Sequence, residues 1–292
     1  MKQFLADFSK LIKFRLTFLV VFSASVTFLI GSKVPVDGIT PDINWTNWLI
    51  LIVGGFLVTS AANCFNEVIE VDLDKLMTRT KDRPMPAGHM TTGQGLVSGL
   101  VMGLVGTWLL GNYLNIVTGF LSVFSIFLYA FAYTPLKRKS PIAVFVGAIP
   151  GALPPLIGYV AAHGKIDQIA VILFLIQFVW QFPHFWAIAW VLDDDYKKAG
   201  FRLLPTTKRD KTSAFITFLS TLILIPVSLM PTFYGFGGYY IAGVSILGGL
   251  VFAALAFKMW INMDLVSARK VMFCSFFYLP IVQLVLLFDF IA

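Results

Sequence analysis

The sequence has few charged residues for its length. Of its 292 residues, 13% are charged and 58% are hydrophobic, whereas soluble domains average about 25% charged residues. A soluble fold of this size could not bury so much apolar surface. The low charge therefore excludes an ordinary soluble protein and predicts one that is embedded in a membrane.

Cysteine is scarce, and the alternating pattern of membrane β-strands is absent. The two cysteines, Cys64 and Cys274, fall within apolar runs. This placement predicts two buried free thiols rather than a disulfide or a metal-binding pair. Without strands that alternate between apolar and polar residues, a β-barrel is also excluded. The remaining way to cross a bilayer is the α-helix, which satisfies its own backbone hydrogen bonds.

Long apolar runs are what the sequence does contain. A membrane-crossing helix needs about 20 mostly apolar residues, and nine runs meet this requirement. We therefore predict a polytopic, all-α membrane protein with nine transmembrane helices in a single domain. The predicted spans are 14–32, 45–66, 93–113, 115–134, 141–161, 168–191, 212–232, 238–260 and 271–290. Their even spacing suggests two duplicated four-helix halves, about 14–134 and 141–260, with a ninth helix appended.

The net charge of +7 is distributed very unevenly between the two ends of these spans. Of the 22 basic residues, 20 fall at one end of the predicted bundle, and only Lys33 and Lys165 fall at the other. By the positive-inside rule the basic end faces the cytoplasm, with the N-terminus inside and the C-terminus outside. This distribution predicts a bacterial inner-membrane protein that contacts the lipid bilayer rather than a nucleic acid.

A first acidic cluster closes the second predicted span. At helical spacing Glu67, Glu70 and Asp74 share one face with Asn66 nearby, whereas Asp72 points elsewhere. Carboxylates this close to a membrane repel one another unless a cation neutralises them. Oxygen ligands of this kind suit Mg²⁺, which binds one or two carboxylates together with substrate phosphates.

Basic residues follow the first cluster at once. Arg79 and Arg83, with Lys81 between them, could bind a diphosphate through forked hydrogen bonds. The simpler alternative is a solvated loop with internal salt bridges. A second cluster at the end of the sixth span favours the diphosphate, because it lies four helices later and therefore on the same side of the membrane.

The second cluster combines acidic and basic residues with one histidine, and a third basic patch opens onto the same side. His184 precedes Asp195 by about three helical turns and would lie deeper than the carboxylates. It could be structural, or it could contact an acceptor substrate, act as a base or bind a metal. The other residues of this group are Asp193, Asp194, Lys197 and Lys198 in the second cluster, and Tyr133, Lys137, Arg138 and Lys139 in the third patch.

Several segments together resemble the UbiA-type intramembrane prenyltransferases, and within them the protohaem IX farnesyltransferases, or haem O synthases. The resemblance covers nearly the whole chain. It rests on E-V-D-L-D-K-L-M-T-R-T-K-D-R-P (Glu70 to Pro84), Y-T-P-L-K-R (Tyr133 to Arg138), G-A-I-P-G-A-L-P-P-L-I-G-Y (Gly147 to Tyr159), W-Q-F-P-H-F-W-A-I-A-W (Trp180 to Trp190) and D-Y-K-K-A-G-F-R-L-L-P (Asp195 to Pro205).

The resemblance implies transfer of a farnesyl group from farnesyl diphosphate to a vinyl group of haem b, followed by addition of water. It implies a possible hand-over of the product to a haem A synthase or to oxidase assembly factors. The implied catalytic residues are Asn66, Glu70, Asp74, Asp195 and His184. The implied Mg²⁺ ligands are Asn66, Glu67, Glu70, Asp74 and Asp195, and the implied diphosphate-binding residues are Arg79, Arg83, Lys137, Arg138, Tyr133 and Lys198.

The sequence departs from the family pattern at a few positions. Glu67 and Glu70 stand where the wider family has aspartates, and the first aspartate of the second motif aligns with Val191, so that only Asp195 carries over. Relatives in quinone pathways carry an acidic residue near the place of His184. An aromatic quinone precursor is therefore an alternative acceptor. A transporter and a haem-binding scaffold are further alternatives, and the concentration of charge at one membrane face disfavours the transporter.

Overall fold

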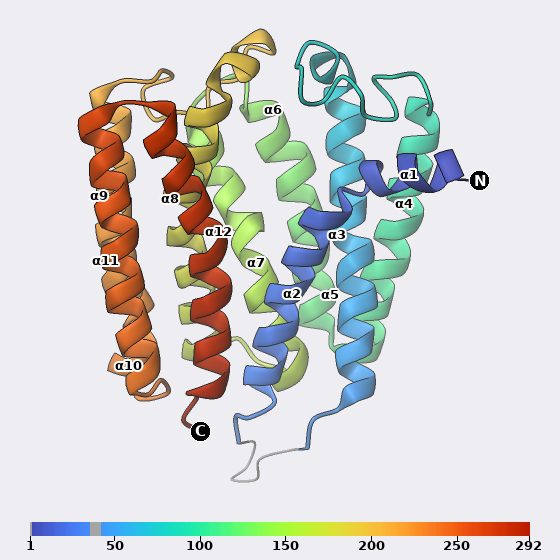
Figure 1. The fold of residues 1–292 in the computed structure, drawn as a ribbon. Coiled ribbons are helices and arrows are strands. Elements are labelled where there is room, and N and C mark those ends of the chain that lie inside the picture. The colour runs from blue at the N-terminus through green and yellow to red at the C-terminus, as the bar shows by residue number, and fades with distance from the viewer. Residues whose placement is uncertain (1, 36–41) are drawn as a thin grey trace.

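The structure is a computed structural model that describes residues 2–35 and 42–292. This part of the chain folds almost entirely into helices (Figure 1). The elements are α1 (Lys2–Leu11), α2 (Phe14–Gly31), α3 (Trp45–Asp74), α4 (Thr92–Leu109), η1 (Leu110–Leu114), α5 (Ile116–Phe127), η2 (Leu128–Tyr133), α6 (Thr134–Leu136), α7 (Ile142–His163), α8 (Gln168–Lys198), α9 (Lys211–Ser228), α10 (Met230–Phe233), α11 (Tyr239–Asn262) and α12 (Leu265–Phe288).

Nine helical segments in the described residues are long and apolar enough to cross a bilayer, as predicted. Three of them extend well beyond the predicted runs. The second continues from residue 66 to Asp74, the sixth continues from residue 191 to Lys198, and the ninth begins at Leu265 rather than at residue 271. The polar extension of α3 stays helical because its acidic face is buried against other elements rather than solvated. The carboxylates therefore lie on rigid helix, which fixes their spacing.

The long helices form a closed ring in which each contacts its neighbours along the chain. α2 packs on α3 and on α7, and α12 closes the ring against α2 and α8. The termini lie at opposite ends of the bundle, and α1 runs across it near the end that carries the loops 75–91 and 199–210 (Figure 1). The first helices of the two proposed halves, α2 and α7, are thus in direct contact. The duplication itself stays a prediction.

Small residues bring α3 and α4 close together. A side chain at Gly106 of α4 would lie 2.9 Å from Leu57 Cβ and 3.0 Å from the Gly54 carbonyl oxygen of α3. Such stripes of small residues let backbones approach in a membrane, where packing rather than the hydrophobic effect holds helices together. Both cysteines are free thiols, as predicted, but only Cys64 is buried, whereas Cys274 is partly exposed, contrary to the prediction.

Helix α7 contains three internal prolines, and a side chain of α8 compensates for one of them. Pro155 has no N–H, so the carbonyl of Gly151 loses its partner within the helix. Gln177 of α8 donates its side-chain amide to this carbonyl at 2.6 Å. The same side chain accepts a hydrogen bond from Ser23 of α2 at 2.8 Å and one from Gln283 of α12 at 3.1 Å. One glutamine therefore joins four helices at the centre of the bundle.

Two short π-helical turns interrupt the third and fourth spans. The second turn, η2, covers Leu128–Tyr133 directly before Thr134 and the basic patch that begins at Lys137. A π-turn contains one residue more than an α-turn, and such turns occur often at functional sites. It sets the direction in which Tyr129, Tyr133, Thr134 and Lys137 leave the helix.

Candidate active site

One face of α3 carries a row of acidic and amide side chains toward the end of the bundle where the loops lie. Asn66, Glu67, Glu70 and Asp74 are all buried. Glu67, Glu70 and Asp74 recur every three or four residues, so the helix places them one above the other, as the sequence predicted, and Asn66 lies one turn before Glu70. Asp72 lies off this face with its side chain 84% exposed. We call these four buried side chains the acidic row.

Each carboxylate of the acidic row lies beside a cation from another segment. Lys137 donates to Glu70 at 2.7 Å, and Arg83 donates to Asp74 at 2.7 Å. The same guanidinium lies 3.4 Å from Glu67. The row thus brings together the predicted residues Glu67, Glu70, Asp74, Arg83 and Lys137 within one network.

Lys13 is a third cation in this network, although it was not predicted to belong to the site. Its ammonium donates to the Asn66 side-chain oxygen at 2.6 Å. Lys13 adopts the left-handed conformation (φ 49°) at the break between α1 and α2, a strained geometry for a residue with a side chain. Asn63 holds the break in place by donating to the Ile12 carbonyl at 3.2 Å and to the Thr17 hydroxyl at 3.1 Å.

Asn66 links the network together. Its side-chain N–H group donates to Glu70 at 2.8 Å and to the Thr134 hydroxyl at 3.1 Å. Since its oxygen receives Lys13, the orientation of this amide is set by three partners. Thr134 follows η2, and like Lys13 it was not predicted to belong to the site. No local sequence pattern could reveal either residue, because each meets Asn66 from more than 50 positions away.

Burial strongly affects the cations of the network. Desolvation, together with the nearby Arg83, lowers the pKa of Lys13 from 10.5 to about 7. Desolvation also lowers the pKa of Lys137, although Glu70 acts against it. Arg83 behaves differently, because the carboxylates of Glu67 and Asp74 outweigh desolvation and raise its pKa. Glu67 and Asp74 thus stabilise the positive charge of Arg83 in this network.

Several carboxylate oxygens in the acidic row accept no hydrogen bond. Among the residues that the structure describes, Oε2 of Glu67 and Oδ1 of Asp74 are buried without a donor, and Oε1 of Glu67 and of Glu70 meet only the cations Arg83 and Lys137, without a hydrogen bond of good geometry. Such atoms are costly unless something else neutralises them. Oxygen donors on a rigid helix are the ligands that Mg²⁺ prefers. The residues therefore fit the predicted metal, although in the described chain no three acidic, histidine or cysteine side chains are already grouped as a metal site.

Asp195, the predicted ligand from the second cluster, has a different environment. Its two oxygens accept the backbone N–H groups of Thr78 and Arg79 at 2.8 and 3.0 Å. Lys198 donates to Asp195 at 3.0 Å and to the Thr78 hydroxyl at 2.8 Å. The structure thus joins Asp195 and Lys198 to the loop that follows α3, and not to the acidic row itself.

The remaining basic and aromatic candidates surround the acidic row. The Arg79 guanidinium lies 5.9 Å from the ring centre of Tyr196, and the Lys137 ammonium lies 5.1 Å from the ring centres of Tyr133 and Phe201. These distances are typical of cation–π contacts. Arg138 is exposed next to this group.

Asp193 and Asp194 belong to a separate structural contact. Lys197 lies 2.6 Å from Asp193, and Arg209 lies 3.0 Å from Asp194. Arg209 also donates to the carbonyl of Trp190 at 2.7 Å. Both carboxylates therefore hold the loop after α8 against its own helix.

His184 lies deeper in the membrane and does not contact the acidic row. Its ring stacks on Trp180 with the ring centres 4.3 Å apart, and its Nδ1 lies 2.8 Å from the Ser275 hydroxyl of α12. Eleven residues separate it from Asp195, which is roughly 16 Å along a helix. The predicted depth below the carboxylates is thus present in the structure.

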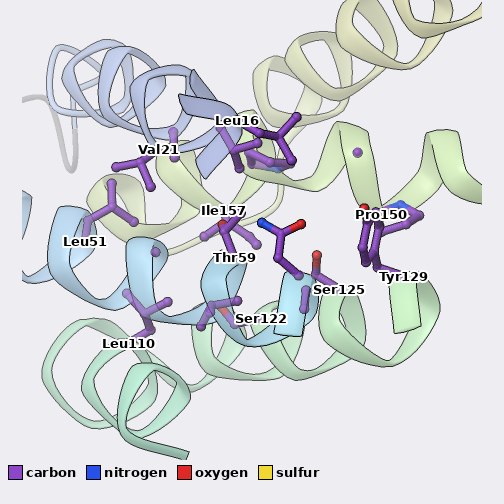
Figure 2. A pocket seen from close by; sticks show the side chains of 18 residues that line it. Leu16, Val21, Leu51, Thr59, Leu110, Ser122, Ser125, Tyr129, Pro150 and Ile157 are labelled. Atoms are coloured by element: carbon purple, nitrogen blue, oxygen red, sulfur yellow. The ribbon is translucent and has the colours of Figure 1, made fainter. Parts of the chain in front are cut away.

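An apolar cavity lies deeper in the bundle than the acidic row, and Figure 2 shows the side chains that line it. It encloses about 710 Å³, its opening included, between α2, α3, α5 and α7. Two of its lining residues connect it to the site. Asn63 lies three residues before Asn66, about one helical turn, and the carbonyl of Tyr129 accepts a hydrogen bond from the Thr134 hydroxyl at 2.8 Å. The rest of the wall is mostly apolar, with Leu16, Val21, Leu51, Leu110 and Ile157 among its side chains. A cavity of this kind can hold a hydrocarbon chain whose polar head lies at the carboxylates.

Comparison with known proteins agrees with this arrangement. The model of the UbiA prenyltransferase family matches residues 20–279. The chain is 43% identical over 288 residues to a protohaem IX farnesyltransferase of Cytophaga hutchinsonii, with 98% of each chain covered. It is 41% identical over 289 residues to a protohaem IX farnesyltransferase of Christiangramia forsetii, with 98% of this chain and 93% of the relative covered.

Solved structures share the fold at low sequence identity. A structure of digeranylgeranylglyceryl phosphate synthase superposes with a TM-score of 0.79 at 19% identity, and 99% of each chain is covered. A UbiA homologue from Archaeoglobus fulgidus, bound to GPP and Mg²⁺, superposes with a TM-score of 0.67 at 13% identity, covering 96% of this chain and 99% of the other. The described helices of this chain therefore share the fold of these proteins.

Proposed function

This chain belongs to the UbiA prenyltransferase family, and from that premise we propose that it transfers the farnesyl group of farnesyl diphosphate to a vinyl group of haem b. The observation that carries the proposal is the acidic row, with its unsatisfied oxygens and the three cations Lys13, Arg83 and Lys137, beside an apolar cavity. The similarity to protohaem IX farnesyltransferases, which extends over nearly the whole chain, supports the acceptor. We place the enzyme in a bacterial inner membrane with this site facing the cytoplasm.

In the proposed reaction the bond between farnesyl C1 and the diphosphate oxygen breaks, and the diphosphate leaves with the electron pair. The vinyl group of haem b then forms a carbon–carbon bond with farnesyl C1. Positive charge develops on the vinyl carbon next to the ring, water adds to it, and the water loses a proton. The product is haem with a hydroxyethylfarnesyl side chain, or haem O, which would pass to a haem A synthase or to oxidase assembly factors.

Asn66, Glu67, Glu70 and Asp74 would hold Mg²⁺, with Asp195 as the further predicted ligand. When bound, the metal supplies positive charge that stabilises the departing diphosphate. The chain's own cations provide the rest of that charge. Arg83 and Lys137 already lie at the acidic row, and a diphosphate offers them the same kind of oxygen that the carboxylates now offer. Arg79, Arg138, Tyr133 and Lys198 would complete the diphosphate site at the mouth.

The apolar cavity has two roles in this proposal. It binds the farnesyl chain along the membrane interior, and its lining keeps bulk water from the allylic carbon until the carbon–carbon bond forms. Polar atoms in the wall are few, and they include Thr59, Ser122, Ser125 and Tyr129 (Figure 2). Tyr129 lies where the cavity approaches the acidic row, and its ring face could stabilise an allylic cation.

The decisive experiment is mass spectrometry of haems extracted from membranes that express the protein, with and without added farnesyl diphosphate. We expect a species heavier than haem b by one farnesyl group and one water. Glu70→Gln should abolish it, because this change removes one carboxylate and leaves Lys137 buried without its counter-ion. Asp72→Asn, an exposed residue on the same helix, should retain it.

Other outcomes would select other functions. Unchanged haem b from folded wild-type protein would reject haem as the acceptor, and prenylation of an added aromatic quinone precursor would then identify the alternative enzyme. Product from Glu70→Gln at the wild-type level would reject the acidic row as the reaction site, whereas a carrier or scaffold would yield neither product.

A further inference from the structure

The surroundings of His184 are apolar and aromatic on nearly every side. Trp180 stacks on the imidazole at a ring angle of 20°, and the rings of Phe185 and Phe276 meet its edge. Trp180 is itself fixed, because its indole N–H donates to the Ser275 carbonyl at 2.9 Å. No carboxylate contacts the histidine in the described residues. The imidazole is thus clamped between α8 and α12 in one orientation.

The hydrogen bonds around Ser275 determine which ring nitrogen carries the proton. The Ser275 hydroxyl has a single proton, and it donates this proton to the Met272 carbonyl, which can only accept. Its oxygen must therefore accept the bond from His184 Nδ1 at 2.8 Å, so Nδ1 carries the N–H. Nε2 of the neutral imidazole is left with its lone pair.

His184 Nε2 is free to bind something else. Within the described chain it has no hydrogen-bond partner, and it is not among the unpartnered side-chain atoms that packing seals completely, such as Trp190 Nε1. An imidazole with Nδ1–H held by a hydrogen bond and Nε2 exposed is the usual form of a histidine metal ligand. The outer partner fixes the ring and its tautomer, and the free nitrogen meets the metal.

The position of His184 on α8 turns it toward the centre of the bundle. It lies seven residues from Gln177, close to two full turns, so both residues share one helix face. Gln177 meets α2, α7 and α12 on that face. His184 is therefore nearer than Gln177 to the end that holds the acidic row, at a greater depth than the carboxylates.

We infer that His184 binds the iron of the acceptor porphyrin through Nε2, and that Ser275 is the positioning residue that fixes its tautomer. This inference rests on the proposed function. Trp180 stacks on the imidazole and fixes the ring, whereas Phe276 meets it at 71°, close to the right angle at which a porphyrin ligated through Nε2 would lie. Iron ligation would hold the macrocycle below the diphosphate. The histidine then sets which acceptor is used, and the acidic row sets which donor is used.

The test is a spectroscopic titration of the purified full-length protein in detergent with haem b and, separately, with metal-free protoporphyrin IX. We expect wild-type protein to give the absorption and EPR signature of a histidine-ligated haem. His184→Gln should lose this signature and weaken haem binding roughly tenfold to a hundredfold, with metal-free porphyrin binding unchanged. Added imidazole should restore the signature.

Ser275 provides the second variant. Ser275→Ala should shift the haem signature and weaken haem binding, whereas Ser275→Thr, which keeps the hydroxyl, should behave as wild type. A histidine signature that survives in His184→Gln would overturn the inference, and so would an equal loss of affinity for both porphyrins. If His184→Gln does not fold, the same titration is made with His184→Ala, which should also lose the histidine signature.

The design separates this inference from the proposed function. Glu70→Gln should keep the histidine signature while losing farnesyl transfer. A wild-type protein that shows the signature but yields no farnesylated haem would reject the proposed reaction and leave the His184 ligand in place. A wild-type protein that farnesylates haem without any histidine signature would reject the ligand alone.

Discussion

Two nearby acids on α3, Glu70 and Asp72, show that the type of a residue alone does not predict whether it belongs to the site. Both are acidic and only two positions apart, yet one is buried beside Lys137 and the other has its side chain 84% exposed beside Lys75. The helical period of 3.6 residues decides between them, and it could be read from the sequence. The acidic row could therefore be predicted. Of its three cations, Arg83 and Lys137 were predicted and Lys13 was not.

Lys13 belongs to the site, but no pattern in the sequence indicates this. Its contact with Asn66 spans 53 positions and depends on a left-handed backbone turn between two helices. The resemblance implied Lys198 as a diphosphate-binding residue, but it could not show that Lys198 also contacts Thr78 and Asp195. Pairings of this kind follow from tertiary packing, which no local pattern contains.

The position of Lys13 leads to a specific expectation. Lys13→Met should lower kcat/KM for farnesyl diphosphate roughly tenfold to a hundredfold, because a charge-assisted hydrogen bond contributes about 1.5–3 kcal/mol. Steady-state kinetics with varied farnesyl diphosphate would measure this change. Lys10→Met is the matched control, since Lys10 is exposed and reaches only the Asp82 carbonyl at 3.4 Å. Equal kinetics for the two variants would mean that Lys13 only neutralises the resting acidic row.

At the scale of elements, α3 joins the polar and apolar halves of the site. Its acidic row lies at one end, and deeper residues of the same helix, Gly55, Val58, Thr59 and Ala62, line the cavity. The apolar run predicted the membrane part of this helix but ended at residue 66. The polar residues that follow lowered the average hydrophobicity, while their buried face kept the helix intact as far as Asp74.

The cavity wall allows a test of where the prenyl chain lies. A side chain at Gly55 would meet only Val21 at 3.8 Å, so Gly55→Leu can fill the cavity without disturbing the helices. We expect this variant to lose activity with farnesyl diphosphate and to retain more of it with the shorter geranyl diphosphate. Turnover of both donors would be compared in the same membranes.

The control for Gly55 comes from another helix. Gly243 of α11 also has open space around it, with nothing within 4 Å of an added side-chain carbon, and it does not line the cavity. Gly243→Leu should leave both activities unchanged. An equal loss with both donors in Gly55→Leu would place the hydrocarbon chain elsewhere.

At the scale of the whole molecule, the sequence predicted the number of spans because the bilayer sets one length for all of them. It did not predict that α2 and α7 pack against each other, or that α12 closes the ring on α2 and α8. In a membrane these contacts depend on small residues and on polar links such as Gln177, and hydropathy reports neither.

The orientation of the whole bundle can be measured directly. The 20 basic residues at one end predict a cytoplasmic N-terminus and an outer C-terminus. Alkaline phosphatase fused after Ala292 should be active and a fluorescent protein fused there should be dark, with the opposite pattern for fusions in the loop 199–210. Active phosphatase in that loop would place the acidic row on the outer side.

The π-turn η2 gives this part of the site room for one change in chain length. A π-turn holds one residue more than an α-turn, while the helix beyond it keeps the same face. Removing one residue of 128–133 would therefore restore an ordinary α-turn and leave Thr134 and Lys137 directed at Asn66 and Glu70. A single-residue deletion within the regular helix α3 would instead rotate every residue beyond it by about 100° and break up the acidic row. Among descendants of this chain, a single-codon deletion should thus survive in η2 and be lost in α3.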